Sequence, residues 1–207
     1  MSKLAADLFY FPNLEFFCAI LDYDEVVFCR GQEFRRKSFI NRTDILGPNK
    51  VQRLTVPIQG RRPRIPEGKL LIDYEQKWVM GHLRSIQSAY GKAPFFEHYF
   101  PFFEQIFQKE HSHLWDLNLD ILTLCLRFLG IPAKIVLVDD PAEIQVEKDI
   151  RGHMSTQEPY TTRNYYRATP YFQLFGVDFE PNLGVLDLLF NVGPESKMIL
   201  SDSVKKH

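Results

Sequence analysis

The sequence predicts an α/β fold, a single domain with a small, at least partly parallel sheet covered by long amphipathic helices. Between residues 8 and 29 an apolar run, a short helix and a second apolar run follow one another closely, as in a βαβ unit. Long helical patterns come next, and amphipathic helices need a sheet to cover. The 207 residues, 45% of them hydrophobic, suffice for one core, so we expect residues 1–207 to form one domain.

The predicted βαβ unit begins with Leu8–Phe11 as a buried strand that Pro12 ends. Asn13 is a suitable N-cap for the helix, and Glu25–Cys29 is the second strand. Ligands of parallel sheets bind beyond the carboxyl ends of the strands. This rule places residues 12–14 and 30–34 near a candidate cleft.

The section from Phe34 to Leu70 is strongly basic. It holds ten Lys or Arg and two acidic residues, a local charge of +8 in a chain of net charge −1. Such a field attracts anionic ligands, whereas the structural alternative is a solvated pair of strands with outward arginines. We expect one strand at Arg53–Ile58 and a loop at residues 61–68. If this section forms a separate antiparallel hairpin, the fold is α+β instead.

The rest of the chain alternates helices with loops. Helices are expected at residues 75–91, 95–109 and 112–129, a strand at Lys134–Val138, a long loop or lid at 139–169, an Asn182-capped helix to Val192, a short extended segment at Lys197–Leu200 and a flexible tail at 201–207. Gly91 and Gly130 follow two of these helices as C-cap residues.

The helix ending at Gly91 carries the most polar groups. His82 is a candidate general base with Ser85 one turn further on, and the structural alternative is a boundary histidine bonded to a backbone carbonyl. Arg84 and Ser88 share a face that either binds an oxyanion or faces solvent.

Three further groups are candidates for binding. The run from Arg36 to Arg42 offers cations and an amide to a phosphate or carboxylate. Asn118 lies within an apolar helical stripe, so its amide needs a partner in the core or a ligand. Asp187 and Asn191 form a polar strip on an apolar helix, which faces either water or a polar cleft.

Several classes of protein are not indicated. The sequence contains no P-loop, dinucleotide-binding turn, nucleophile elbow or paired CxxC, and His111 and His113 do not share a helical face as metal ligands would. Cys18, Cys29 and Cys125 lie in apolar runs as reduced core residues do. No stretch is long enough to span a bilayer. We expect a cytoplasmic protein with no metal, no nucleic-acid partner and no membrane span.

Four stretches together resemble the WbqC-like protein family of bacteria. They are YFPNLEFF at 10–17, KSFINR at 37–42, HLRSIQSAYGKAPFFEHY at 82–99 and FEPNLGVLDLLFNVGPES at 179–196. Many members carry a histidine in the first strand and turn, which this chain lacks. The positions that the resemblance marks as functional are Ser38, Asn41, Arg42, His82, Arg84, Ser85, Gln87, Ser88, Tyr90, Asn182, Asp187 and Asn191.

The resemblance implies a role in surface-polysaccharide (O-antigen type) or nucleotide-sugar metabolism. We expect a transferase for a phosphate-bearing sugar intermediate, with Arg42 and Arg84 holding the anion, His82 as acid or base and Asp187 orienting it. The alternative is a non-catalytic module that binds an anionic glycan precursor or an envelope-assembly partner. The sequence specifies neither the cofactor nor the oligomeric state.

Overall fold

The computed structural model describes residues 1–60 and 64–205. Arg61 and Arg62 of the basic section, and the last two residues of the predicted tail, lie outside the described residues.

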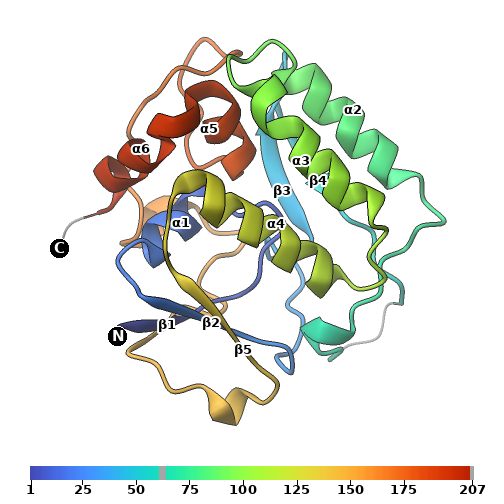
Figure 1. Cartoon of the computed structure of the whole chain (residues 1–207), viewed down its shortest axis with the longest axis vertical. Helices are drawn as coiled ribbons and strands as arrows, with labels where there is room; N and C mark the ends of the chain where they lie inside the picture. Colours follow the sequence, from blue (N-terminus) through green and yellow to red (C-terminus); the bar gives the residue numbers. More distant parts are fainter. Residues whose placement is uncertain (61–63, 206–207) are drawn as a thin grey trace.

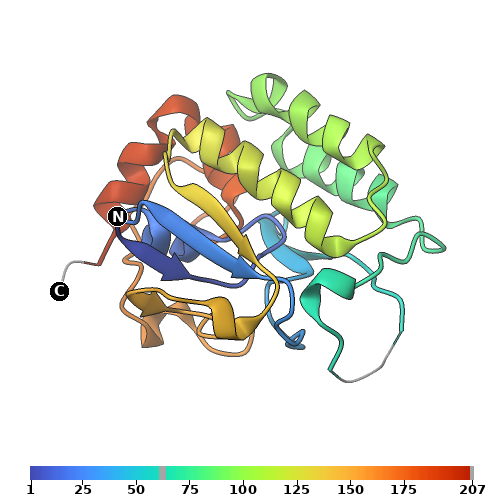
Figure 2. The same ribbon diagram turned by 60° about the horizontal axis from the view of Figure 1, so that its bottom comes forward.

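A small parallel sheet lies at one end of the molecule (Figure 2). Its strands are β1 (Lys3–Ala5), β2 (Glu25–Cys29), β5 (Lys134–Val138) and β6 (Lys148–Asp149), in the order β5-β2-β1-β6. Every neighbouring pair is parallel, so all carboxyl ends meet at one edge. The α/β fold is therefore confirmed.

The first strand is not where the sequence predicted it. β1 is Lys3–Ala5, and Leu8–Phe11 is a buried irregular segment in which Phe11 has φ 42°. Its backbone polar groups bond to a side chain and to another loop instead of to a neighbouring strand. The Leu8 carbonyl accepts a hydrogen bond from the Asn118 side chain, and the Tyr10 N–H donates to the Phe39 carbonyl. A buried apolar run has no periodicity that distinguishes a strand from such a segment.

The predicted crossover between two parallel strands is present. The helix α1 (Leu14–Ile20) connects β1 to β2, and the Asn13 side chain accepts a hydrogen bond from the Phe16 N–H at 3.1 Å. Every residue of α1 is buried. The N-cap at Asn13 is confirmed.

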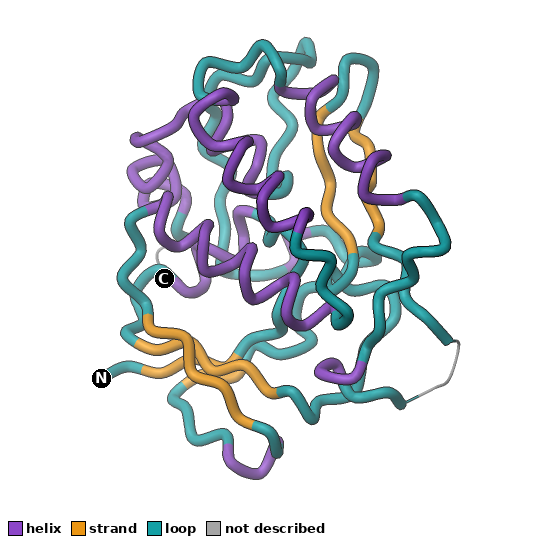
Figure 3. The backbone as a smooth tube through the Cα atoms, turned by 45° about the vertical axis from the view of Figure 1, so that its right-hand side comes forward, coloured by secondary structure: helices purple, strands orange, loops and turns teal. Residues whose placement is uncertain are grey.

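The basic section forms a second, separate sheet. β3 (Arg42–Leu46) and β4 (Val51–Thr55) are antiparallel, and Figure 3 shows this hairpin beside α2 and apart from the parallel sheet. The separate antiparallel hairpin that the α+β alternative predicted is therefore present, but in a protein that also has a parallel sheet. The strand predicted at Arg53–Ile58 ends earlier, because Pro57 lacks the N–H that a ladder needs.

The remaining helices pack around these two sheets (Figure 1). They are α2 (Trp78–Tyr90), α3 (Phe96–Gln108), α4 (Leu114–Leu129), α5 (Val185–Val192) and α6 (Ser196–Ser203), with short 3₁₀ turns η1 (Glu67–Lys69), η2 (Pro141–Glu143), η3 (Tyr160–Thr162) and η4 (Gly193–Glu195). The extended segment predicted at Lys197–Leu200 is wrong, since these residues lie in α6.

Two other predictions for the C-terminal part change. Asn182 does not cap α5, because the N-cap of this helix is Gly184. The Oδ1 atom of Asn182 instead accepts a hydrogen bond from the Glu15 N–H of α1 at 2.8 Å. The start of the predicted tail belongs to α6, and Ser203 is buried. Residues 139–169 are mostly irregular, and they supply the strand β6 and the turns η2 and η3.

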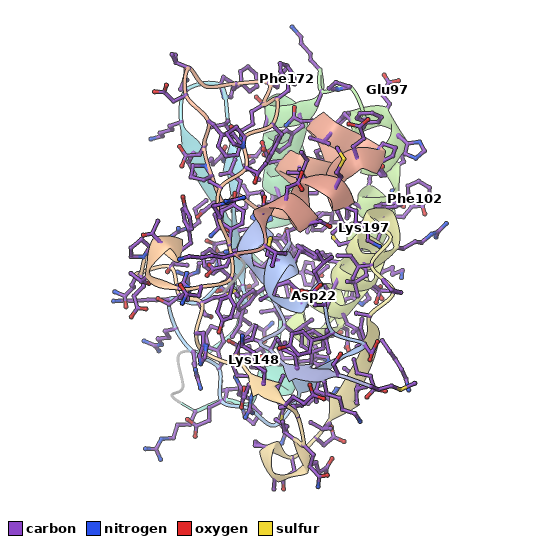
Figure 4. All side chains as sticks on the ribbon, turned by 90° about the vertical axis from the view of Figure 1, so that its left-hand side faces the viewer. Asp22, Glu97, Phe102, Lys148, Phe172 and Lys197 are labelled. Carbon is purple, nitrogen blue, oxygen red and sulfur yellow. The ribbon has the colours of Figure 1, made fainter. Side chains whose placement is uncertain are left out.

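One hydrophobic cluster joins the helices α1 to α6 to strands of both sheets. It includes the buried rings of Phe9, Phe16 and Phe103. Figure 4 shows Phe102 and Phe172 at the periphery instead, with exposed fractions of 39% and 63%.

Candidate functional site

A pocket of about 510 Å³ opens at the carboxyl edge of the parallel sheet. There the residues that follow β2 and β5 meet η1 and the amino end of α4 (Figure 1). Its lining residues are Arg30, Gly31, Pro66, Gly68, Lys69, His113, Asp116 and Asp139. We refer to it as the edge pocket.

Backbone hydrogen bonds hold the walls of the edge pocket together. The Arg30 N–H donates to the Val138 carbonyl at 2.9 Å, and the Gly68 N–H donates to the Arg30 carbonyl at 3.0 Å. The Leu114 N–H at the start of α4 donates to the Leu70 carbonyl at 2.9 Å. Four separate parts of the chain are therefore fixed around one opening.

Glycine is required at one wall. A Cβ atom at Gly31 would collide with the backbone carbonyl oxygen of Asp139. At Gly68 the contact is less severe, since a Cβ there would lie 3.0 Å from the Cβ of Arg30. The strand ends approach as closely as they do because residue 31 lacks a side chain.

Charged side chains of both signs line the edge pocket, and their mutual contacts are loose. Arg30 Nη2 lies 3.6 Å from Asp116 Oδ1, and His113 Nδ1 lies 3.8 Å from Asp116 Oδ2. Both distances exceed that of a hydrogen bond. The side chains of Arg30, Asp116 and His113 are 47%, 45% and 41% exposed. Lys69 and Asp139 are exposed as well.

The Arg30 guanidinium lies over the buried ring of Trp115, 5.9 Å from its centroid. This cation–π contact holds the cation at the pocket without consuming its hydrogen-bond donors. A planar fork with free donors suits a phosphate or carboxylate ligand.

A buried carboxyl pair lies behind the pocket wall. Gln32 Nε2 donates to Asp7 Oδ1 at 2.5 Å and approaches Glu67 Oε1 at 3.5 Å. Burial raises the pKa of both carboxyl groups, and the Arg35 and Arg151 cations oppose this rise. The Gln32 side chain lies between the two carboxyl groups, and its contact with Glu67 holds the loop after β2 against η1.

His82 of α2 lies in the core, where its neighbours are protein groups. Its Nδ1 is 2.9 Å from the Tyr10 hydroxyl, and the ring donates to the Thr55 backbone carbonyl. Burial lowers the pKa of His82 to about 4. With Tyr10 at Nδ1, the Thr55 backbone beside the ring and a residue exposure of only 6%, His82 is poorly placed to reach a substrate. This geometry favours the structural interpretation of His82.

One face of α2 is buried and the other is exposed. Trp78, His82, Ile86 and Tyr90 face the core, whereas Val79 and Leu83 are only partly buried. Arg84, Gln87 and Ser88 point outward and are exposed. Ser85 accepts a hydrogen bond from Gln52 at 3.0 Å.

The basic section and α2 do not share one cleft. Gln52 projects from the hairpin face that α2 covers. Side chains alternate along a strand, so Arg42 and Asp44 project from the opposite face, where Asp44 pairs with Arg53 at 2.7 Å. The shared Arg42–Arg84 site expected from the sequence therefore does not form.

Asp187 and Asn191 are buried, so the polar strip of α5 does not face water. Asp187 Oδ2 accepts from the Tyr171 hydroxyl at 2.7 Å and from Gln173 at 2.8 Å, and Tyr90 donates to the same carboxylate. Asn191 donates to the Asp187 carbonyl at 2.8 Å. Burial raises the pKa of Asp187. This network orients Tyr90 and does not reach His82 or Arg84.

The other predicted binding residues mostly fix the backbone. Asn118 donates to the carbonyls of Leu8 and Ile40 at 3.0 and 2.8 Å. Asn41 donates to the Val56 carbonyl at 2.9 Å, and Ser38 to the Arg35 carbonyl at 2.6 Å. Arg36 is exposed on the loop after β2. Asn182 holds the start of α1, as described above.

Sequence reasoning reached the edge pocket only in part. The carboxyl-end rule did mark residues 30–34. The sequence suggests His113 only as a metal ligand and gives no signal for Asp116, because both residues become candidates only through their position next to Arg30. Within residues 1–60 and 64–205 no three His, Cys, Asp or Glu side chains form a metal-binding group. In the same ranges no helix combines the length and hydropathy needed to cross a membrane.

Comparison with known proteins is consistent with the resemblance found in the sequence. The model of the WbqC-like protein family matches residues 9–157. A Mycobacterium tuberculosis protein described as "Uncharacterized protein Rv1507c" is 27% identical over 218 residues, covering 90% of this chain and 92% of the relative. No solved structure matches the chain.

Proposed function

Because the chain belongs to the WbqC-like protein family, we propose that it is a transferase for a phosphate-bearing sugar intermediate, such as a nucleotide sugar. The proposal places it in surface-polysaccharide or nucleotide-sugar metabolism in the bacterial cytoplasm. Three free, buried cysteines support a reducing compartment. The edge pocket replaces the α2 face as the proposed site.

One observation carries this proposal. At the carboxyl edge of the sheet, two cations (Arg30 and Lys69) and a half-exposed histidine beside a carboxylate (His113 and Asp116) line the same pocket. The cations suit a phosphate group, and an imidazole ring with a carboxylate beside it suits the role of a general base.

The reaction assigns a role to each group. An acceptor hydroxyl gives its proton to His113 Nε2, and its oxygen forms a bond to the anomeric carbon of the sugar. The bond between that carbon and the phosphate oxygen breaks, and its electron pair stays on the phosphate. Arg30 and Lys69 neutralise the charge of the leaving phosphate.

Calorimetric titration with a nucleoside diphosphate sugar tests the binding step. Arg30→Ala should weaken binding by about 1 to 3 kcal/mol, the scale of a lost charge-assisted hydrogen bond. Arg42→Ala is the control, since Arg42 is a partly exposed arginine of the basic section that lies on the outer face of the hairpin and does not line the edge pocket. Equal weakening by both variants would show that only the general positive field matters, and would refute the edge pocket as the site.

A second measurement separates the two functional classes. In a transferase, His113→Gln stops turnover and leaves binding of the nucleotide sugar nearly unchanged. A binding module has no turnover to lose. If the nucleotide sugar binds and this binding needs Arg30, but mass spectrometry detects no product with any of a panel of acceptor hydroxyls, the non-catalytic alternative is favoured.

A further inference from the structure

In the edge pocket, Asp116 lies between two groups that compete for it. One carboxylate oxygen faces Arg30 at 3.6 Å and the other faces His113 at 3.8 Å. Neither contact is short enough for a hydrogen bond, so the carboxylate is shared and committed to neither.

The other contacts of Arg30 fix the aliphatic part of its side chain and leave the guanidinium able to move. The stem lies close to η1, because a Cβ added at Gly68 would lie 3.0 Å from its Cβ atom and 3.3 Å from its Cγ atom. The guanidinium lies over the Trp115 ring, a contact that tolerates sliding more easily than a bidentate hydrogen bond. An anion in the pocket therefore competes with Asp116 for this guanidinium.

We propose that Asp116 is a positioning residue that an incoming phosphate displaces from Arg30 and so releases to hydrogen-bond His113. This inference rests on the proposed function and names how ligand binding is coupled to the base. Once Asp116 accepts from Nδ1–H, that ring nitrogen keeps the proton and Nε2 is left as the acceptor. Orientation of a histidine by a carboxylate in this way fixes its tautomer.

The same region supplies a matched control one turn further along α4. Asp120 pairs with His111 Nε2 at 2.9 Å and with Lys109 at 2.6 Å. It shares the helix and the carboxylate–histidine–cation chemistry of Asp116, but it is not among the residues that line the edge pocket. Asp120→Asn therefore tests for general effects of a lost carboxylate on α4.

The experiment is a titration of ¹⁵N-labelled protein with inorganic phosphate at about pH 8, with the ring nitrogens of His113 observed by NMR. In the unmodified protein, phosphate should shift His113 to the tautomer that carries hydrogen on Nδ1. Asp116→Asn should abolish this response and bind phosphate about two- to fivefold more tightly, because a competing anion is gone. Asp120→Asn should behave as the unmodified protein does.

Arg30→Ala supplies the opposite test. Without the guanidinium, Asp116 is already free, so His113 should show the Nδ1–H tautomer in the absence of phosphate. Phosphate binding that leaves the His113 ring unchanged, or an Arg30→Ala variant whose ring resembles the unliganded protein, would overturn the proposal. If phosphate does not bind at all, the proposed function itself fails, which is a separate result.

Discussion

The polar groups around α2 and α5 differ from those of the edge pocket in how firmly they are paired. Asp187 accepts from Tyr171 at 2.7 Å, and Tyr10 lies 2.9 Å from His82, with all four residues buried or partly buried. In the edge pocket, Asp116 approaches its two partners at 3.6 and 3.8 Å, half-exposed. Both regions carry groups that look catalytic in a sequence.

This difference predicts where substitutions should affect stability and where they should affect ligand binding. A buried hydrogen-bonded group is expensive to remove, because its partners remain desolvated without a bond. A half-exposed charge with loose contacts contributes little to stability and is free to bind a ligand. Changes near α2 should therefore alter unfolding, whereas changes at the edge pocket should alter ligand binding.

The largest effect is expected at Asp187. Asp187→Ala removes the acceptor of Tyr171, Gln173 and Tyr90, so it should lower the free energy of unfolding by about 3 kcal/mol. Urea denaturation measures this loss, and phosphate affinity should stay unchanged. A loss below about 0.5 kcal/mol, typical of surface sites, would contradict the buried network.

The next effect concerns the pH dependence that His82 confers. Its pKa is lowered to about 4 in the folded state, so the unfolded chain binds a proton first as the pH falls. The stabilisation due to neutral His82 is present above about pH 6.5 and is lost as the pH falls from there towards 4, by up to ~3 kcal/mol.

The measurement is the difference in unfolding free energy between the unmodified protein and His82→Gln across this pH range. A difference is needed because the raised pKa values of Asp7, Glu67 and Asp187 act in the opposite sense, stabilising the folded state as the pH falls. If the difference does not vary with pH, His82 is not a buried neutral side chain.

A smaller loss of stability is expected for Gly31→Ala, and this variant should change both the unfolding free energy and the phosphate affinity. Gly31→Ala forces the ends of β2 and β5 apart at the Asp139 carbonyl, at a cost of about 1 to 3 kcal/mol. Because this carbonyl is part of the edge pocket wall, phosphate affinity should fall as well. Gly81→Ala is the control, since a Cβ at Gly81 meets nothing within 4 Å.

The smallest effects are expected on the outer face of α2. Arg84→Ala and Ser88→Ala should each change the unfolding free energy by less than about 0.5 kcal/mol and leave phosphate binding unchanged. Calorimetry and denaturation on the same samples test both statements. A clear loss of phosphate binding in Arg84→Ala would return the proposed site to α2.

The sequence by itself determined the fold class, the helices other than α6, and the family. The periodic patterns of α2, α3 and α4 specify helices because an amphipathic stripe must be buried, and Lys134–Val138 is the strand β5 as predicted. The pairing of the first two strands as parallel neighbours was also inferred correctly, although β1 precedes the predicted strand Leu8–Phe11. These features depend on local spacing, which a sequence contains in full.

Only the tertiary structure decided what the polar residues do. His82, Asp187 and Asn118 could equally have bonded a ligand or the core, and their partners are as much as 110 residues away in the chain, as with Asn118 and Leu8. Arg30, Lys69 and His113 come from three separate segments and meet only because the carboxyl ends of β2 and β5 adjoin η1 and α4. Proximity between distant segments is a property of the folded chain, so no local pattern records it.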